Sequence, residues 1–495
     1  MGGRNQRSSA RQLQLTAYLD KVARGAASGT ISCNNKTDIF RMKLSDKQRQ
    51  GLKLYKYSGV DKSILSKTIL TPYWNNLVKL FPRYIAPNTI TLMGLTMIFI
   101  NIVTLLWFDP KYEGHALPSW VYWSFSIGLF IYQSMDAIDG KQARRTGMAG
   151  PLGEMFDHGC DAINVTLEVI LAQAAFGYSR SWWTVASQAA AISNFYLSTW
   201  EEYHTGSLYL SAFSGPVEGI LMICVMFAIT AVKGPLFWTT PVIKSVPYVC
   251  NLLDRRLAML GGKNKVMDMT PMGKGMVPVL NLGQLGDKLY KTLSAVGWLR
   301  ELSIREAFMW FGALGLLGNI ANAYVNVITA RRKQNLPLLP PLLGLLPFLA
   351  HVALLVSWLG GAGVEIVQSV RMLPFIAYWG ACFSYQVSKL ILAHVTKSPF
   401  PYWNGMMVWT ALGAIDANAP LLFGREPFIQ NTEQRATYFV LASMVIAILN
   451  YLRFAKSVIW QITDFTGLAC FTVRHKDEQG GWVDNQQAVD DRKKQ

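Results

Sequence analysis

Ten apolar segments, each about twenty residues long, decide what this 495-residue chain can fold into. They lie near 84–108, 119–138, 152–175, 182–200, 216–232, 304–329, 336–358, 369–394, 403–423 and 435–455. A run of this length crosses a bilayer as a helix, and a helix satisfies its own backbone hydrogen bonds within the hydrocarbon. Charged residues make up only 16% of the chain, against about 25% in a soluble protein. The sequence therefore predicts an all-α polytopic membrane protein with about ten transmembrane helices.

The segment 64–83 precedes the first long apolar run and mixes apolar with polar residues. Lys67 and Lys79 lie among its apolar side chains, and Tyr73 and Trp74 are residues that favour the headgroup level of a bilayer. The pattern predicts an N-terminal interfacial amphipathic helix. The alternative is a helix whose apolar face packs on its own domain.

The net charge of +17 follows from basic residues that flank the apolar segments. Such residues mark cytoplasmic loops and attract anionic lipid headgroups, so no nucleic-acid partner is expected. Residues 1–83 contain sixteen Lys or Arg and four Asp, which predicts a cytosolic N-terminal side. Alternation of the spans then places the loop 233–302 on the lumenal side, although this loop is basic. The preference of basic loops for the cytoplasmic side does not hold for loops longer than about 60 residues.

The cysteines are scattered along the chain, with no CxxC pair and no histidine at zinc-binding spacing. We expect reduced thiols, without a disulfide framework or a structural metal, at Cys33, Cys160, Cys224, Cys250, Cys382 and Cys470.

Four aspartates gather at the junction of the second and third apolar segments. Asp136 and Asp139 are three residues apart, and Asp157 and Asp161 are four apart. Both spacings place two side chains on one face of a helix. The two helices are consecutive and meet at their cytosolic ends, so we expect the four carboxylates to point at one place.

Carboxylates at membrane depth are costly unless they are paired or bind cations. Oxygen ligands suit Mg²⁺, Mn²⁺ or Ca²⁺, and two such ions on shared carboxylates can clamp a phosphoryl group. Gly140 and Gly153 leave room for a nucleotide to approach the backbone. Lys141 and Arg144 are expected on the adjoining turn, where they can meet phosphate oxygens.

An ion transporter is the alternative of a different class, because intramembrane acids also line ion paths. The aspartates cluster at one end of the spans, however, and the last five apolar segments carry few acids, with Asp416 the only one away from a segment end. This distribution favours a catalytic site.

The stretch 136–161 resembles the signature of the CDP-alcohol phosphotransferase family, D-x-x-D-G-x-x-A-R, eight residues, G-x-x-x-D-x-x-x-D. Every specified position matches: Asp136, Asp139, Gly140, Ala143, Arg144, Gly153, Asp157 and Asp161. The resemblance implies four metal-binding aspartates, two Mg²⁺ or Mn²⁺ ions, and substrate contacts at the remaining positions.

Further runs resemble the eukaryotic choline and ethanolamine phosphotransferases, and the run at 198–221 resembles fungal members. They are TPYW at 71–74, IAPNTIT at 85–91, DGKQARRT at 139–146, PLGEMFDHGCDA at 151–162 and STWEEYHTGSLYLSAFSGPVEGIL at 198–221. The implied substrates are CDP-choline or CDP-ethanolamine and diacylglycerol. A homodimer in the endoplasmic reticulum or Golgi membrane is implied as well. Another activity of the family, with inositol or glycerophosphate as acceptor, is the alternative.

Two residues compete as the base that takes the proton of the diacylglycerol hydroxyl. His158 is favoured, since a metal-bound Asp161 would be a weak base. By resemblance Glu218 lies near His158 and orients it. The alternative is that Glu218 lies at the water interface, where the N-terminus of a helix favours a carboxylate. Asn88 is a candidate nucleotide contact, and its alternative is a helix cap after Pro87.

These features divide the chain into six regions. A basic, partly disordered cytosolic segment at 1–63 and the interfacial helix at 64–83 come first. The catalytic helices follow at 84–232, and the long loop at 233–302 separates them from additional transmembrane helices at 303–456. A cytosolic tail at 457–495 ends the chain, and the active site is expected on the cytosolic side.

Overall fold

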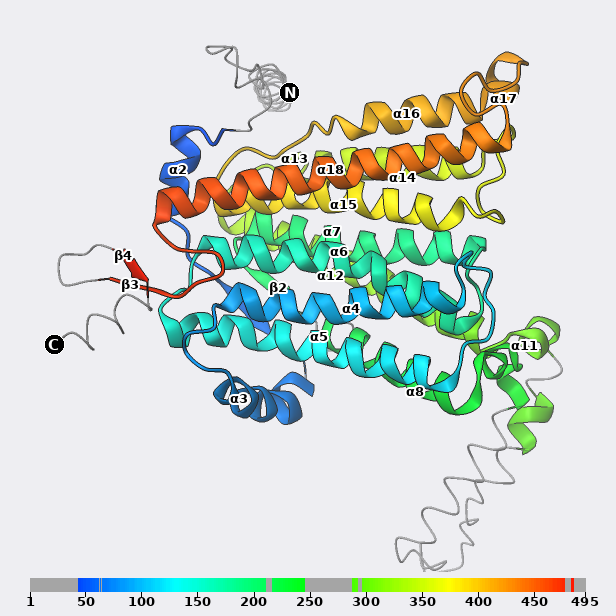
Figure 1. Ribbon diagram of the computed structural model, residues 1–495, viewed down its shortest axis with the longest axis horizontal. Helices are drawn as coiled ribbons and strands as arrows, with labels where there is room; N and C mark the ends of the chain where they lie inside the picture. The colour runs from blue at the N-terminus through cyan, green and yellow to red at the C-terminus, as the bar shows by residue number, and fades with distance from the viewer. Residues whose placement is uncertain are drawn as a thin grey trace, which may run out of the picture.

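The computed structural model describes residues 43–61, 63, 65–210, 216–244, 287–292, 296–476 and 482–484. Long helices run side by side in one bundle (Figure 1). Most of the predicted disordered segment at 1–63, most of the loop at 233–302 and the last part of the tail lie outside the described residues.

A helix lies in each of the ten predicted apolar ranges. In chain order these helices are α4 (Pro87–Phe108), α5 (Ser119–Thr146), α6 (Pro151–Phe176), α7 (Trp182–Thr205), α8 (Pro216–Lys233), α12 (Ile304–Lys333), the pair α13 (Pro340–Leu343) and α14 (Leu346–Leu359), α15 (Met372–Val395), the pair α16 (Met406–Ala417) and α17 (Ala419–Phe423), and α18 (Glu433–Thr466).

Within the residues that the structure describes, five helical segments are long and apolar enough to cross a bilayer by themselves: Pro87–Phe108, Pro151–Phe176, Ile304–Lys333, Pro340–Leu359 and Glu433–Thr466. The outward face of α12 is apolar and uncovered, with Trp310 59% and Leu314 67% exposed. Large apolar side chains are left uncovered in this way where lipid or another protein covers them. The chain is an all-α membrane protein.

Helix α6 lies at the centre of the bundle, where α4, α7 and α15 surround it. Its apolar part is 72% buried. The contact with α15 is close because Gly380 faces Thr166, and a Cβ at Gly380 would lie 2.6 Å from the Thr166 side chain. This packing holds the second aspartate pair in a rigid, enclosed position.

Helix α5 extends beyond the predicted range 119–138. It continues to Thr146 and ends where Gly147 adopts a left-handed conformation with φ 72°, which glycine tolerates without a steric penalty. The prediction that Lys141 and Arg144 lie on a turn is therefore wrong. Both lie on the last two turns of α5, closer to the C-terminal end of this helix than Asp136 and Asp139.

Helix α18 also extends past its predicted end at 455 and reaches Thr466. The added turns bury Val458, Gln461 and Ile462 against the rest of the protein. The hydropathy pattern ends earlier because these turns contain polar residues, among them Lys456, Gln461 and Asp464.

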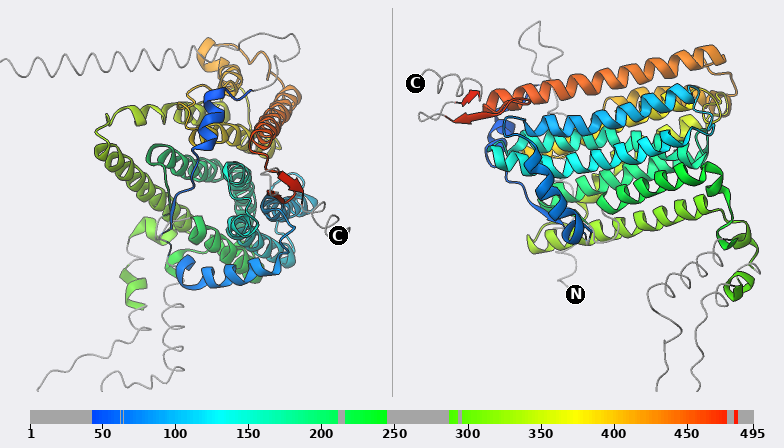
Figure 2. Two further views of the ribbon diagram at one scale, coloured as in Figure 1. Left: turned by 90° about the vertical axis from the view of Figure 1, so that its left-hand side faces the viewer. Right: turned by 60° about the horizontal axis from the view of Figure 1, so that its bottom comes forward.

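The segment predicted as an interfacial helix forms a π-helical turn at Ser66–Leu70 and then α3 (Thr71–Leu80). Trp74 and Val78 are buried in one apolar cluster with Ile90 of α4, Ile138 of α5 and Val217 of α8. Figure 2 shows α3 lying across one end of the bundle. Its apolar face thus packs on the protein, and its placement at a bilayer surface stays a prediction.

Short elements connect the helices at both ends of the bundle. They are α2 (Asp46–Lys53), β1 (Gly59–Asp61), β2 (Leu208–Leu210), the 3-10 helix Pro235–Thr239, α11 (Gly297–Glu301), β3 (Arg474–Lys476) and β4 (Trp482–Asp484). Strands β1 and β2 pair in parallel, with Gly59 opposite Leu208, and β3 and β4 pair antiparallel. The β1–β2 pair ties the segment after α2 to the end of α7.

Candidate active site

The two aspartate pairs are brought together by the tight connection between α5 and α6. Gly147 ends α5, and Pro151 occupies the first turn of α6, where its missing N–H costs nothing. Asp136 and Asp139 lie on α5, and Asp157 and Asp161 lie in the first three turns of α6.

Three of the four carboxylates converge closely. One oxygen from each of Asp136, Asp157 and Asp161 lies within 4.8 Å of the other two. Asp139 is not part of this group of three, and its carboxylate accepts a hydrogen bond from the Thr91 hydroxyl on α4. The charge of Asp157 nevertheless interacts with those of Asp139, Asp136 and Asp161, so the four form one electrostatic cluster.

The cluster has the properties of a divalent-cation site. Asp157 Oδ1 is buried and has no hydrogen-bond partner, although a buried carboxylate oxygen normally has one. Nearby, Asp161 accepts a hydrogen bond from the Tyr132 hydroxyl, which fixes its orientation. An unpartnered oxygen among like charges is what a bound cation would satisfy, so the residues fit Mg²⁺ or Mn²⁺.

Two signature glycines border open space. A Cβ at Gly153 would meet no atom within 4 Å, and one at Gly140 would meet only Arg144 Nη1 at 3.8 Å. The space next to both backbones agrees with the predicted approach of a nucleotide. Ala143 is 8% exposed, and its predicted substrate contact stays a prediction.

The two basic signature residues on α5 have different surroundings. Lys141 Nζ donates a hydrogen bond to Asn75 Oδ1 at 2.9 Å, which ties α5 to α3. Arg144 is exposed at the end of the bundle, and within the described chain it forms no ion pair. One bond to Asn75 leaves the Lys141 ammonium two further donors, so phosphate contacts by Lys141 and by Arg144 both stay predictions.

His158 lies on α6 within electrostatic reach of four carboxylates. They belong to Glu202, Glu154, Asp161 and Asp136. Glu202 and Glu154 were not singled out by the sequence.

Glu218, at the start of α8, accepts a hydrogen bond from the Ser63 hydroxyl. Its other oxygen, Oε2, is buried and has no hydrogen-bond partner. In the described part of the chain no hydrogen bond joins Glu218 to His158, so the expected orienting contact stays a prediction.

Asn88 lies in the first turn of α4 and is 6% exposed. The N-cap of this helix is Ala86, with no side-chain hydrogen bond, which contradicts the reading of Asn88 as a cap. Its amide nitrogen lies 3.5 Å from Cys470 Sγ. Asn88 thus faces the interior of the bundle, one turn before Thr91, the partner of Asp139.

Sequence reasoning missed the three hydroxyl groups that hold the acidic residues: Thr91, Tyr132 and Ser63. Tyr132 lies four residues before Asp136, which places it one turn earlier on α5. Hydroxyl residues at such spacing are too common in helices to be a signal by themselves.

Similarity to known proteins extends along most of the chain. A family model described as CDP-alcohol phosphatidyltransferase matches residues 84–246. A CDP-alcohol phosphatidyltransferase class-I family protein of Schizosaccharomyces pombe is 39% identical over 440 residues, 88% of this chain and 99% of that protein. Cholinephosphotransferase 1 of Saccharomyces cerevisiae is 32% identical over 440 residues, 86% of this chain and 97% of that protein. Choline/ethanolaminephosphotransferase 1 of the same yeast is 36% identical over 368 residues, 73% and 81% of the two chains.

The family match includes α4 to α8, and these helices carry every aspartate of the signature. Because the relatives also align with the helices beyond this region, the likeness is not confined to one motif. The resemblance predicted from the sequence is confirmed: this chain belongs to the CDP-alcohol phosphatidyltransferase family.

Proposed function

We propose that this chain transfers phosphocholine, phosphoethanolamine or both from the CDP-alcohol to diacylglycerol. The products are the phosphatidyl lipid and CMP. The observation that carries the proposal is the convergence of Asp136, Asp157 and Asp161 within a complete family signature. The names of the yeast relatives, a cholinephosphotransferase and a choline/ethanolaminephosphotransferase, support this choice of substrates.

Asp136, Asp139, Asp157 and Asp161 would hold two divalent cations. When bound, these cations supply positive charge that offsets the diphosphate and the charge that develops on the transferred group. The aspartates are held by hydroxyl donors from two helices, so the site is preorganised before substrate arrives.

The remaining signature residues position the nucleotide. Gly140 and Gly153 leave its approach open, Arg144 binds phosphate oxygens, and Asn88 is proposed as a contact to the nucleotide from α4. His158 accepts the proton of the diacylglycerol hydroxyl as that oxygen bonds to the β-phosphorus. The bond from the β-phosphorus to the bridging oxygen breaks, and CMP leaves with that oxygen.

Glu218 is proposed to position His158 once substrate is bound. Its buried Oε2 accepts no hydrogen bond, so it can take one without losing another. Asp161 is the alternative base, and the two are separated by experiment below.

The wider setting is proposed as well. All ten helical ranges cross the membrane, α3 lies at its cytosolic surface, and the protein works as a homodimer in the endoplasmic reticulum or Golgi. The aspartates lie at the end of the bundle that carries Lys141, Arg144 and Arg145, and basic residues of this kind favour the cytosolic side.

Removal of divalent metal is expected to abolish turnover. Without cations, neighbouring carboxylates repel each other and the diphosphate. Purified protein treated with EDTA should form no phospholipid, and excess Mg²⁺ or Mn²⁺ should restore the rate. Full activity in a preparation shown by elemental analysis to be metal-free would refute the assignment of the aspartates.

The acceptor separates the proposed activity from the other activities of the family. Purified protein should release CMP from CDP-choline or CDP-ethanolamine when diacylglycerol is added, and should release none from CDP-diacylglycerol when inositol or glycerol 3-phosphate is added. CMP release from CDP-diacylglycerol with either of those acceptors would support the alternative activities, and ion flux without CMP release would support a transporter.

A further inference from the structure

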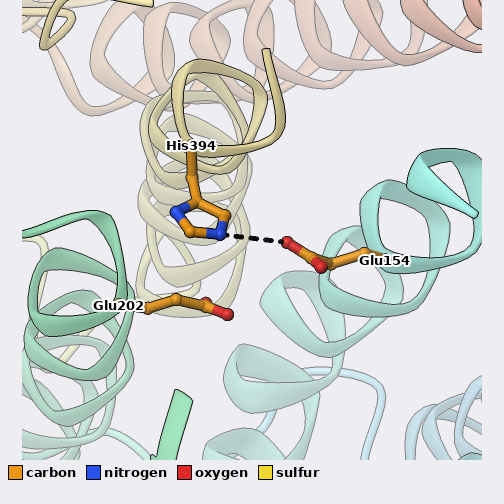
Figure 3. A group of neighbouring side chains, drawn as sticks. All are labelled: Glu154, Glu202 and His394. Carbon is orange, nitrogen blue, oxygen red and sulfur yellow. Dashed lines mark ion pairs between the residues drawn. The ribbon is translucent and has the colours of Figure 1, made fainter. Parts of the chain in front are cut away.

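A second group of polar side chains lies at the same end of the bundle and outside the signature. Glu154 in the first turn of α6, Glu202 in the last turn of α7 and His394 in the last turn of α15 point toward one another (Figure 3). One ligand atom from each lies within 4.8 Å of the other two, and His394 Nε2 is 3.8 Å from Glu154 Oε1. The three residues are 7%, 3% and 7% exposed, respectively.

This group carries two glutamate carboxylates, and the basic groups that face them are histidines. His394 contacts Glu154, and His158 acts electrostatically on Glu202. Glu154 Oε2 accepts a hydrogen bond from the Tyr55 hydroxyl, but Oε1 is buried and has no hydrogen-bond partner. Lys397 acts on Glu202 electrostatically, yet no Lys or Arg of the described chain forms an ion pair with either glutamate. Two buried carboxylates without a cation are costly, so the arrangement favours a positively charged ligand.

The group adjoins the reaction centre. Glu154 precedes Asp157 by three residues and His158 by four on α6, a separation of about one helical turn, or about 5 Å. In a CDP-alcohol the nitrogen of choline or ethanolamine lies four bonds from the β-phosphorus, at a reach of about 5 Å. An ammonium group can thus reach Glu154 while its phosphate stays at the aspartates.

Two tyrosines from the segment after α2 complete the surroundings. Tyr55 contacts Glu154 directly. Tyr57 is 55% exposed, and partial burial, followed by the charges of Glu202 and Glu154, raises its pKa to about 12. The Ser58 and Ser207 hydroxyls, 2.5 Å apart, hold this segment against the end of α7. Aromatic rings beside carboxylates are the surroundings in which proteins bind quaternary ammonium groups.

We propose that Glu154, Glu202 and His394, with Tyr55 and Tyr57, bind the ammonium group of the CDP-alcohol. The site gives the enzyme its preference for a cationic amino alcohol over a neutral alcohol. This inference rests on the proposed function and adds the residues that recognise the head group.

The test compares ligands that differ only in this charge. Purified protein is titrated with CMP, with CDP-choline, and with the CDP ester of 3,3-dimethylbutanol, which replaces the quaternary nitrogen by carbon. The parent should bind CDP-choline about 10- to 100-fold more tightly than the neutral ester. In Glu154→Gln and Glu202→Gln this preference should fall close to onefold, while CMP affinity stays unchanged.

Two further variants sharpen the result. Glu201→Gln is the matched control, because Glu201 is the chain neighbour of Glu202 but accepts a hydrogen bond from Asn326, and it should keep the parental preference. Tyr57→Leu alters an exposed side chain rather than the core, and it should weaken CDP-choline binding about 2- to 5-fold without changing CMP binding.

The outcomes are distinct. Loss of CMP and CDP-choline affinity together in both glutamine variants would show a structural role and overturn the proposal, as would an unchanged preference. Loss of one bound metal ion from Glu202→Gln, with the preference retained, would show a metal site instead. A parent that makes phospholipid but does not distinguish the two esters contradicts the head-group site alone. A parent that binds no CDP-alcohol contradicts the proposed function too.

Discussion

Replacing Asp157 by alanine is expected to lower phospholipid formation by about 10³-fold or more. Asp157 interacts with all three other aspartates, and its buried Oδ1 has no protein partner. Loss of this ligand removes several kcal/mol of transition-state stabilisation, and each ~1.4 kcal/mol is a factor of ten in rate. Asp136→Ala should behave in the same way, because Asp136 belongs to the same converging group.

Folding should survive both substitutions, because each removes a buried charge from a cluster of like charges. The elution profile and the melting temperature of the detergent-purified variants measure this. Asp464→Ala is the matched control, since Asp464 is an exposed aspartate on α18 and lies outside the cluster. A folded Asp157→Ala protein with a near-parental rate would place the catalytic centre elsewhere.

The second large effect is expected at His158. His158→Gln should lower kcat by a factor of about 10² to 10⁴, because only the proton transfer from the diacylglycerol hydroxyl is lost. Metal affinity and CDP-choline affinity should remain, since glutamine keeps a polar side chain and no aspartate is altered. Single-turnover rates and binding titrations on the same preparation separate the two quantities.

Asp161→Asn provides the contrast, because it should weaken metal binding as well as the rate. His115→Gln is the control for histidine loss, since His115 is 65% exposed in the loop between α4 and α5. If His158→Gln turns over at a near-parental rate, the base is Asp161 or water, and His158 has a structural role.

The position of the helices could be predicted from the sequence because apolar runs of span length leave few alternatives. The ends of the helices could not. Helix α5 ends at Thr146, before a glycine in the left-handed conformation, eight residues after the predicted end at 138. The prediction stopped short because the last turns of α5 carry Lys141, Arg144 and Arg145 and are not apolar.

Within the site, the residues that share one helix could be predicted from the sequence. The contacts between segments that are distant in the sequence could not. Asp157 and Asp161 follow from their spacing on one helix. The hydrogen bond from Thr91 to Asp139 joins α4 to α5. Glu154, Glu202 and His394 come from three helices that are spread over more than 200 residues of the chain. No local sequence pattern indicates that these three residues lie together.

One measurement tests the central account most directly. Purified protein reconstituted in vesicles that contain diacylglycerol is supplied with CDP-choline and, separately, with CDP-ethanolamine, in the presence of Mg²⁺. Phosphatidyl lipid and CMP are quantified together in the parent and in Asp157→Ala. The account predicts one lipid formed for each CMP released with at least one CDP-alcohol, and neither product from the variant. CMP released without lipid, or equal yields from parent and variant, would contradict it.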